Sequence, residues 1–248
     1  MNKDVTSEIK NQTGIITINT ADGLNVINRM MLSDIAETIT AMDLNDAVKA
    51  IVIRGSDKAF STGIDVNEFV ENINAAVLEE MYENFEKIAD VKKPVIAAVS
   101  GYALGIGFEL ALACDIIFAS ESARFGHPDL SLGTIPGFGA TQRLTGAIGK
   151  AKTMEMILTG RAMNVHEAER CGMVSRIIPL RYLFDEALNT AERIAALPDL
   201  AINTSKELIK TAVSNTDLEE GLEIEKQVYK NSIESDEFRQ NLVNMAKK

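Results

Sequence analysis

The chain has 248 residues, enough for one large domain or two small ones with a substantial hydrophobic core. Hydrophobic residues make up 46% of it, which excludes general disorder. The net charge of −11 argues against a nucleic-acid or anionic-membrane surface, although it is compatible with a local basic pocket for a phosphate-bearing ligand.

Apolar patterns indicate that strands and helices alternate up to about residue 179. Strands are predicted at residues 14–19, 50–54, 95–99 and 173–178, and helices at 28–42 and 66–90. Residues 114–119 fit either a further strand or the end of a helix, and the pattern leaves both open. Alternation of this kind is typical of an α/β core.

The rest of the chain reads as amphipathic helices without intervening strands. These are predicted at residues 180–197, 199–213 and 217–248, with Pro198 and Asn215 between them. We therefore expect a core over residues 1–179 and a C-terminal helical region over residues 180–248. Such a region commonly covers one face of the core or forms a subunit interface.

Several features indicate the compartment. Residues 1–12 include Asp4 and Glu8 and no apolar signal core, so a secretory or mitochondrial leader is not expected. Cys114 and Cys171 have no paired spacing, which fits a reducing compartment. The longest uncharged stretch, residues 94–108, is too short and glycine-rich to span a bilayer. We expect a cytoplasmic protein with neither a membrane nor a nucleic-acid partner.

Glu109 stands out as an acid in apolar sequence. It is the first formal charge after Lys93, in a segment that reads as a buried strand, a glycine-rich turn and a helix. Burying a carboxylate is costly, so such an acid is usually either satisfied structurally or used chemically. Asp129 follows beside a second loop marked by glycine and proline. Two acids flanking apolar, glycine-rich backbone indicate acid–base chemistry.

Phosphate-loop and metal motifs fit the sequence poorly. Leu110 stands where a dinucleotide fingerprint needs its third glycine, and residues 146–151 lack the spacing and the hydroxyl of a P-loop. His127 lies close to Asp129, but without further ligands this pair makes a poor metal site. His166 fits a solvated helix face. No metal is expected.

The glycine-containing turns fit better as sites of free backbone N–H donors than as phosphate loops. Gly105 and Gly107 bracket Ile106 at the presumed helix start, where N–H groups lack intrahelical partners and the helix dipole is positive. Residues 61–65 form a second glycine-containing turn that could supply another donor. Such donors near Glu109 can polarise a thioester carbonyl and support proton transfer at its α or β carbon. Tight turns with a structural glutamate are the alternative.

Long motifs cover most of the chain: KAFSTGID at residues 58–65, KPVIAAVSGYALGIGFELALACDIIFA at 93–119 and ARFGHPDLSLGTIPGFGATQRL at 123–144. In these motifs the chain resembles the crotonase family of enoyl-CoA hydratases and isomerases. The resemblance implies a spiral of ββα units whose C-terminal helices build a homotrimer or a dimer of trimers. It also implies an acyl-CoA thioester as substrate, with coenzyme A part of that substrate and no separate cofactor.

The resemblance also implies roles for individual residues. It places the oxyanion-hole N–H groups on Ile64 and Ile106, and the catalytic acids on Glu109 and Asp129. Because Ile106 replaces the glycine usual in hydratases, its side chain is expected to narrow the acyl pocket. Further substrate or coenzyme A contacts are placed at Leu24, Lys58, Phe60, Gly63, Asp65, Gly105, Pro128 and Gly137.

Three positions depart from the family pattern. Asp129 is one methylene shorter than the usual glutamate, about 1.5 Å of reach, and a misplacement of about 1 Å can cost about a hundredfold in rate. Asp22 replaces the usual basic residue of the first adenine-contacting loop. The chain stops at Lys247 and Lys248, short of the usual lysine-rich tail. A thioester on an acyl carrier protein is therefore an alternative substrate.

The sequence favours an enoyl-CoA hydratase, which adds water to a 2-enoyl thioester through an oxyanion hole and two carboxylates. The alternatives are a Δ3-Δ2 enoyl-CoA isomerase using one carboxylate, a hydrolase of a hydroxyacyl thioester, and a non-catalytic acyl-thioester binding protein. Decarboxylation of a malonyl-type thioester is disfavoured, because two resident carboxylates would repel the substrate's own.

Overall fold

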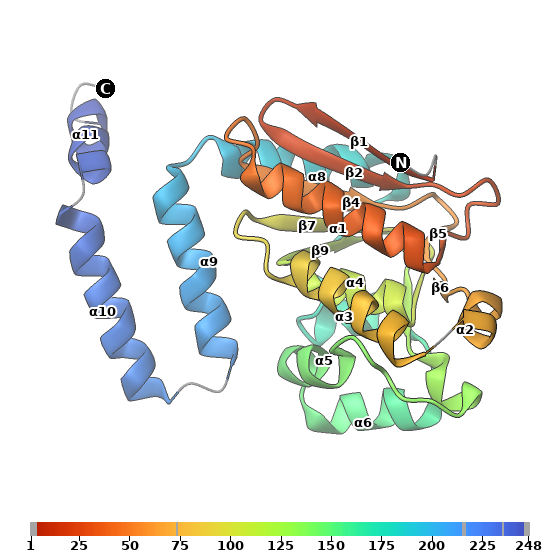
Figure 1. Ribbon diagram of the computed structural model, residues 1–248. Helices are drawn as coiled ribbons and strands as arrows, with labels where there is room; N and C mark the ends of the chain where they lie inside the picture. The colour runs from red at the N-terminus through yellow and green to blue at the C-terminus, as the bar shows by residue number, and fades with distance from the viewer. Residues whose placement is uncertain (1–3, 73, 215–216, 235, 246–248) are drawn as a thin grey trace.

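The computed structural model describes residues 4–72, 74–214, 217–234 and 236–245 (Figure 1). Within these ranges the largest sheet has the strand order β1-β2-β4-β7-β9-β12. Its strands are β1 (Val5–Lys10), β2 (Thr13–Ile18), β4 (Ala50–Arg54), β7 (Val95–Val99), β9 (Ile116–Ala119) and β12 (Arg176–Ile177). Only β1 and β2 pair antiparallel among these described strands, and the remaining pairs are parallel.

The strands of a smaller, second sheet alternate along the chain with those of the large sheet. The smaller sheet consists of β5 (Ala59–Ser61), β8 (Tyr102–Leu104), β10 (Arg124–Gly126) and β11 (Met163–Asn164). Along the chain, β5 follows β4, β8 follows β7 and β10 follows β9, with a helix after each pair. The expected ββα units are therefore confirmed. A short parallel pair, β3 (Val26–Ile27) with β6 (Gly63–Ile64), completes the strands.

Several helices pack in the main core, against one face of the large sheet. The helices over residues 29–170 are α1 (Arg29–Leu44), α2 (Val66–Asn72), α3 (Ala75–Ala89), α4 (Ile106–Ala113), α5 (Ala140–Ile148), α6 (Lys150–Thr159) and α7 (Val165–Arg170), with a 3₁₀ helix η1 (Pro128–Leu132). Asn28 starts α1, since its side-chain oxygen accepts the Met31 N–H at 2.8 Å. The main core includes the fully buried rings of Phe60, Phe108 and Phe125.

The helix α8 (Leu180–Ala195) covers the opposite face of the large sheet. Its Leu183, Ala187 and Ala191 pack in a second core against Val52 and Ile96. Burial on both faces explains why these central strands are almost continuously apolar. The division of the chain at residue 179 stays a prediction.

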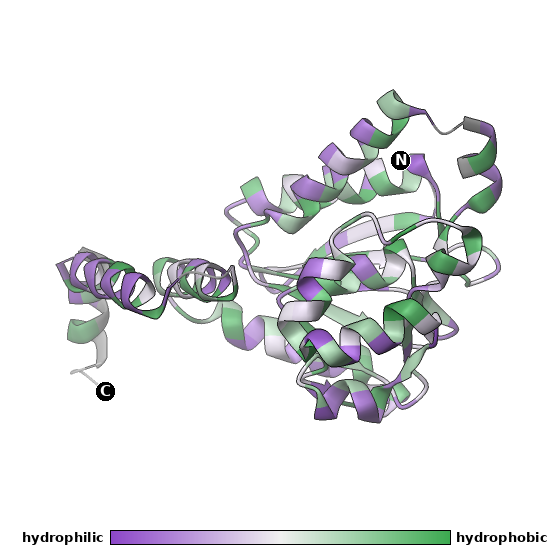
Figure 2. Cartoon of the chain, turned by 90° about the horizontal axis from the view of Figure 1, so that it is seen from below, coloured by the Kyte–Doolittle hydropathy of each residue, from purple (hydrophilic) through white to green (hydrophobic). Residues whose placement is uncertain are grey.

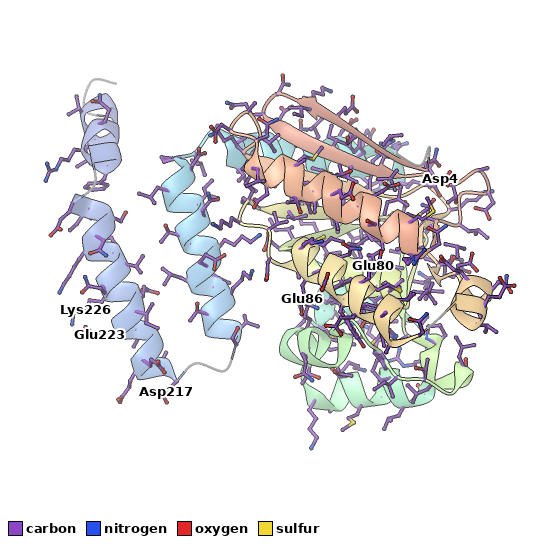
Figure 3. The ribbon with its side chains drawn as sticks, in the orientation of Figure 1. Asp4, Glu80, Glu86, Asp217, Glu223 and Lys226 are labelled. Atoms are coloured by element: carbon purple, nitrogen blue, oxygen red, sulfur yellow. The ribbon has the colours of Figure 1, made fainter. Side chains whose placement is uncertain are left out.

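The helices α9 (Asp199–Val213), α10 (Leu218–Glu234) and α11 (Asp236–Met245), which we call the arm, lie to one side of the core (Figure 1). Lys206 joins α9 to the core, donating to the Lys93 carbonyl at 2.8 Å and the Asp115 carboxylate at 2.7 Å. On α10, Glu223 and Lys226 are exposed and pair at 3.1 Å (Figure 3). Hydrophobic and hydrophilic residues alternate along the arm (Figure 2).

Most of the predicted elements are confirmed, and the differences have local causes. Residues 114–119 contain the strand β9, whereas the strand predicted at 173–178 spans only Arg176–Ile177. One helix over 66–90 is wrong: Asn74 accepts the N–H groups of Ala76 and Val77 and begins α3 anew. One helix over 217–248 is also wrong, because α10 ends at Glu234. The strand β1 was not predicted, because its residues after Val5 are exposed and show no apolar face.

No helix in the described part of the chain is both long and apolar enough to cross a membrane.

An ion-pair network ties α6 to α7 beside the smaller sheet. The Arg161 guanidinium contacts Glu167 at 2.7 and 2.9 Å and also pairs with Glu155, while Lys152 reaches Glu167 at 2.9 Å. The hydrogen bonds from Arg161 and Lys152 lower the pKa of Glu167 from 4.5 to about 2.

We expect Glu167→Gln to destabilise the protein at neutral pH and to destabilise it less at pH 3. A folded pKa below the unfolded one stabilises the folded state above about pH 4.5, and this contribution disappears as the pH falls toward 2. A loss of about 1 kcal/mol would lower the melting temperature by about 2–4 °C. Melting curves from pH 7 to 3 measure this. The control is Glu169→Gln, since Glu169 is exposed on α7. A Tm loss in Glu167→Gln that is equal at pH 7 and pH 3 would contradict a stabilising role of the ionised Glu167 carboxylate.

Candidate active site

The Glu109 carboxyl group is buried at the start of α4, with 1% of the residue exposed. Its Oε1 accepts the N–H of Phe138 at 2.8 Å and the N–H of Ala140 at 3.0 Å. Between them Gly139 has φ +101°, a left-handed conformation that lets both neighbours point their N–H groups at one oxygen. These bonds and the helix N-terminus offset the cost of burying the acid.

Arg143 holds the loop that binds Glu109. Its Nη1 donates to the Phe138 carbonyl at 2.8 Å, and a Cβ at Gly139 would lie only 2.1 Å from the same Nη1. Its guanidinium lies 5.6 Å from the centre of the Phe85 ring. Burial lowers the pKa of Arg143, while the charges of Glu109 and Asp90 act in the opposite direction. Arg143 thus fixes the loop and adds a positive charge near Glu109.

His127 approaches the other carboxylate oxygen. It is 1% exposed, and its Nε2 lies 3.7 Å from Oε2 of Glu109. The imidazole packs beside the Phe108 ring, 6.1 Å between centres. It follows β10, whose Gly126 carbonyl accepts the Gly105 N–H at 3.0 Å. The same strand end therefore places the imidazole and anchors the start of α4.

The two predicted oxyanion turns lie against each other. A Cβ at Gly63 would be 3.3 Å from the Leu104 carbonyl oxygen and 3.9 Å from the Gly105 Cα. Gly107 packs even more closely, because a Cβ there would lie 2.5 Å from that of Ser61. Only glycine permits this approach. It brings the backbone at Ile64 close to the first turn of α4.

The Ile106 N–H is well placed to act as a donor. Ile106 is the first residue of α4, so its N–H has no carbonyl four residues back within the helix, and Gly105 has no side chain to cap it. Glu109 lies one turn further along the same helix. The turns thus present backbone donors on one side and a buried carboxylate on the other.

The second predicted acid, Asp129, belongs to η1, which begins at the exposed Pro128. The Asp129 side chain lies outside the part of the chain that the structure describes. Gly137, another predicted contact, is exposed in the loop before α5. Both stay predictions. Lys247 and Lys248 also lie outside the described residues.

The predicted coenzyme A contacts divide into exposed and structural positions. Leu24 is 40% exposed, whereas Phe60 is completely buried in the main core. The Asp65 carboxylate accepts the N–H groups of Asn67 and Glu68 and so begins α2. Of these three side chains, Leu24 is the most exposed.

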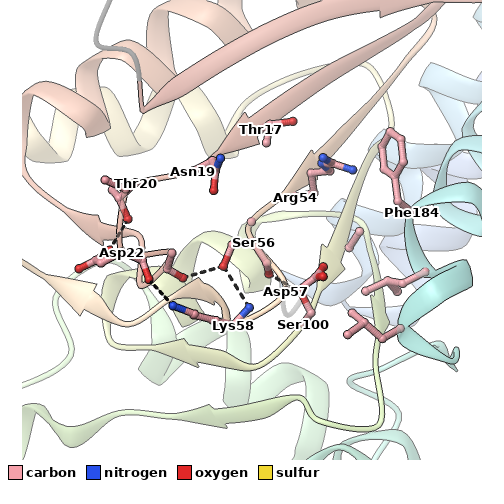
Figure 4. Close-up of a pocket in the computed structure, with 16 residues that line it drawn as sticks. Thr17, Asn19, Thr20, Asp22, Arg54, Ser56, Asp57, Lys58, Ser100 and Phe184 are labelled. Atoms are coloured by element: carbon pink, nitrogen blue, oxygen red, sulfur yellow. Dashed lines mark hydrogen bonds between the residues drawn. The ribbon is translucent and has the colours of Figure 1, made fainter.

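Lys58 and Asp22 meet at the edge of a polar pocket (Figure 4). Lys58 Nζ donates to the Asp22 carbonyl at 3.0 Å. The Asp22 carboxylate accepts the Leu24 N–H at 2.9 Å and the Thr20 hydroxyl at 2.7 Å, and these bonds lower the pKa of Asp22. The acid that replaces the usual basic residue therefore shapes its own loop.

Asn25, which the sequence analysis missed, joins this loop to the smaller sheet. It is completely buried with φ +54°, and its Nδ2 donates to the carbonyls of Ala59 and Phe60 at 2.8 and 3.2 Å. The Oδ1 accepts the Thr20 N–H at 2.9 Å. The sequence signal was an asparagine in a turn, a residue type that tolerates the left-handed conformation.

Other reactive side chains lie away from this arrangement. Burial raises the pKa of the Cys114 thiol well above its ordinary value, which keeps it from acting as a nucleophile. His166 is exposed on α7. Within the described ranges, no group of three or more His, Cys, Asp or Glu side chains is arranged to hold a metal ion.

Comparison with known proteins supports one family. The family described as enoyl-CoA hydratase/isomerase matches residues 8–248. A probable enoyl-CoA hydratase of Rhizobium meliloti is 42% identical over 240 residues, which cover 95% of this chain and 91% of that protein. The mitochondrial enoyl-CoA hydratase of Pongo abelii is 36% identical, over 96% of this chain and 82% of that protein.

Solved structures agree in fold. The crystal structure of an enoyl-CoA hydratase subunit from Geobacillus kaustophilus superposes with a TM-score of 0.92 at 36% identity, covering 98% of this chain and 95% of that one. An enoyl-CoA hydratase from Bacillus anthracis gives a TM-score of 0.91 at 30% identity, covering 99% of this chain and 96% of that one.

Proposed function

The chain belongs to the enoyl-CoA hydratase/isomerase family, and from this premise we propose that it adds water across the double bond of a 2-enoyl-CoA thioester. The observation that carries the proposal is the packing of the Gly63 and Gly105 turns beside the buried Glu109. Because of this packing, the backbone donors and the carboxylate can contact the same ligand. Ile106 is 3% exposed and packs in the main core, so a narrowing of the acyl pocket by its side chain stays a prediction.

The backbone donors stabilise the charge that forms during the reaction. As water attacks Cβ, electron density moves onto the thioester oxygen and an enolate forms. The N–H groups of Ile64 and Ile106 donate to that oxygen. A single donor of this kind is typically worth about 3–4 kcal/mol, because it is fixed in place before charge develops.

Glu109 orients and activates the attacking water. Its Oε1 is held by the N–H groups of Phe138 and Ala140, which fixes the plane of the carboxylate and the direction of Oε2. The water oxygen bonds to Cβ and passes a proton to the Glu109 carboxylate, while Asp129 in its protonated form delivers a proton to Cα. Proton exchange with solvent then restores both acids for the next turnover.

Coenzyme A would enter beside Leu24, an exposed apolar residue of the first loop. The Asp22 carboxylate is engaged in its own turn, and Lys58, whose Nζ donates to the Asp22 carbonyl, is a cation beside this loop. The family relatives named as CoA hydratases, including a 2,3-dehydroadipyl-CoA hydratase of Escherichia coli at 34% identity, favour coenzyme A over an acyl carrier protein as the thioester's carrier. A cytoplasmic location suits this substrate and the unpaired spacing of the cysteines.

The arm suits assembly into a homotrimer or a dimer of trimers. Many apolar side chains on its helices are exposed: Leu200, Ile209, Val213, Leu218, Leu222, Tyr229, Phe238 and Leu242. Exposed apolar side chains gathered on one group of helices are typical of an interface. A neighbouring copy of the chain would cover these side chains.

We expect Glu109→Gln to lower kcat for crotonyl-CoA hydration by about 10²–10⁴-fold, because the amide cannot accept the water proton. Asp129→Asn should also lower kcat. The loss of enoyl absorbance measures both. Wild-type activity no higher than that of the double variant would contradict hydration, and turnover of 3-enoyl-CoA without water addition would indicate the isomerase.

We expect Arg143→Met to lower kcat by about 10–100-fold with little change in KM, because the loop that holds Glu109 shifts. The acidic limb of the pH profile should move to higher pH, since the carboxylate loses a nearby positive charge. Arg143→Lys should restore part of both. A variant with a lowered melting temperature but an unchanged kcat and pH profile would show that Arg143 is only structural.

We expect light scattering to give three or six times the 27.0 kDa chain mass. Leu242→Glu should shift the mass toward a single chain, because it places a charge in an apolar contact. Arg239→Glu on the same helix is the matched control. A wild-type mass of one chain would contradict the assembly.

A further inference from the structure

The polar pocket that Lys58 and Asp22 border, which we call the Arg54 pocket, lies at the carboxyl ends of β2, β4 and β7 (Figure 4). Its volume is about 530 Å³. Thr17, Arg54 and Ala98 form its floor, since they are register partners on adjacent strands. The first turns of α8 and residues 55–58 form its walls. Glu109 and the loop that holds it do not line this pocket.

Strand alternation explains why an arginine lies here. Ala50 and Val52 face α8 in the second core, and Arg54 is the next residue of β4 on that face. Its neighbours Thr17 and Ala98 are small, so they leave space above the sheet instead of covering the guanidinium. The guanidinium stacks on the Phe184 ring of α8, 4.2 Å from its centre.

Arg54 has no anionic partner within the described residues. No ion pair or hydrogen bond there engages its guanidinium, and its Nε is closed from solvent. A half-buried cation without a partner is costly. Buried polar groups nearly always have a hydrogen-bond partner, and the closed Nε of Arg54 has none among the described residues, so it can take its acceptor from a ligand.

Arg176 shows what the completed arrangement looks like. Its guanidinium stacks on Phe118 at 4.1 Å, nearly the same distance as in the Arg54 stack. Arg176 also contacts the Glu186 carboxylate at 3.4 Å and the Thr190 hydroxyl at 2.8 Å. The same stacking therefore has an acceptor in one place and lacks one in the other.

The other charged side chains that line the pocket do not pair with the Arg54 guanidinium among the described residues. The Asp22 carboxylate is taken by Thr20 and Leu24, and Lys58 donates to the Asp22 carbonyl. Asp57 is exposed at the rim. At the opposite wall α8 begins without a side-chain cap, so the positive end of its dipole lies beside the stacked guanidinium.

We propose that the Arg54 pocket binds the oxyanion group, phosphoryl or carboxylate, of a small polar molecule other than the thioester substrate. The guanidinium donates to the oxyanion as a fork while its face stays on Phe184. Asn19 and the hydroxyl of Thr17 supply neutral polar groups beside it. The pocket is larger than a bare phosphate, so the anion is the head group of a larger molecule, whose remainder extends toward Asp57.

Titration calorimetry on the full chain tests this with inorganic phosphate and acetate as probes, at constant ionic strength with chloride as the filler. We expect one of the two oxyanions to bind, and the one that binds identifies the head group. Arg54→Met should weaken that binding by at least about tenfold. Arg176→Met, which loses an equivalent Arg–Phe stack, should bind as the wild type does. Arg54→Lys should retain part of the affinity.

If Arg54→Met folds poorly, the wild type alone still tests the proposal. A crystal structure of the wild type with the bound oxyanion should show it against Arg54. Density elsewhere, or no binding of either probe by the wild type, would overturn the proposal. The kcat and KM for crotonyl-CoA should be unchanged in Arg54→Met. A raised KM in Arg54→Met would place the pocket within the thioester site and would also overturn the proposal of a separate oxyanion ligand. A wild type that does not hydrate crotonyl-CoA would count only against the proposed hydration.

Discussion

The site depends on how the Glu109 carboxylate is held in the core. The acid lies in the first turn of α4, and the N–H groups of Phe138 and Ala140 fix its Oε1. Water cannot reorient a carboxylate held in this way, so its remaining oxygen keeps one direction toward a ligand. The loop that provides these donors is itself held by Arg143. A chain of contacts therefore extends from Arg143 on α5 to the Glu109 carboxylate.

Close backbone approach is the second constraint. The turn at Gly63 and the turn at Gly105 come from different ββα units, and they meet because glycine leaves no Cβ between them. Asn25 then joins the first loop to β5 from inside the core. Rigid strands thus position flexible backbone, which is how backbone N–H groups become donors at a fixed place.

Part of the fold was predictable because its signals are local. The strands at 14–19, 50–54 and 95–99 and the helix after Asn28 follow from alternation, periodicity and a cap. The break at Asn74 was not predicted, since an asparagine side chain can point to solvent as easily as to the next N–H groups. The strand β1 was missed because its exposed residues lack an apolar face, and its pairing with β2 supplies the hydrogen bonds that the pattern does not show.

The sequence by itself determined that an acid lies among apolar residues after a glycine-rich turn, and that a second turn of the same kind precedes it. Those facts belong to the chain order, so residue types alone reveal them. Tertiary structure decided which groups surround the acid: His127, the 138–140 amides and Arg143. It also decided that Arg54 stacks on Phe184 without an acceptor, while Arg176 has one. Such contacts join residues far apart in sequence, and only packing sets their distances.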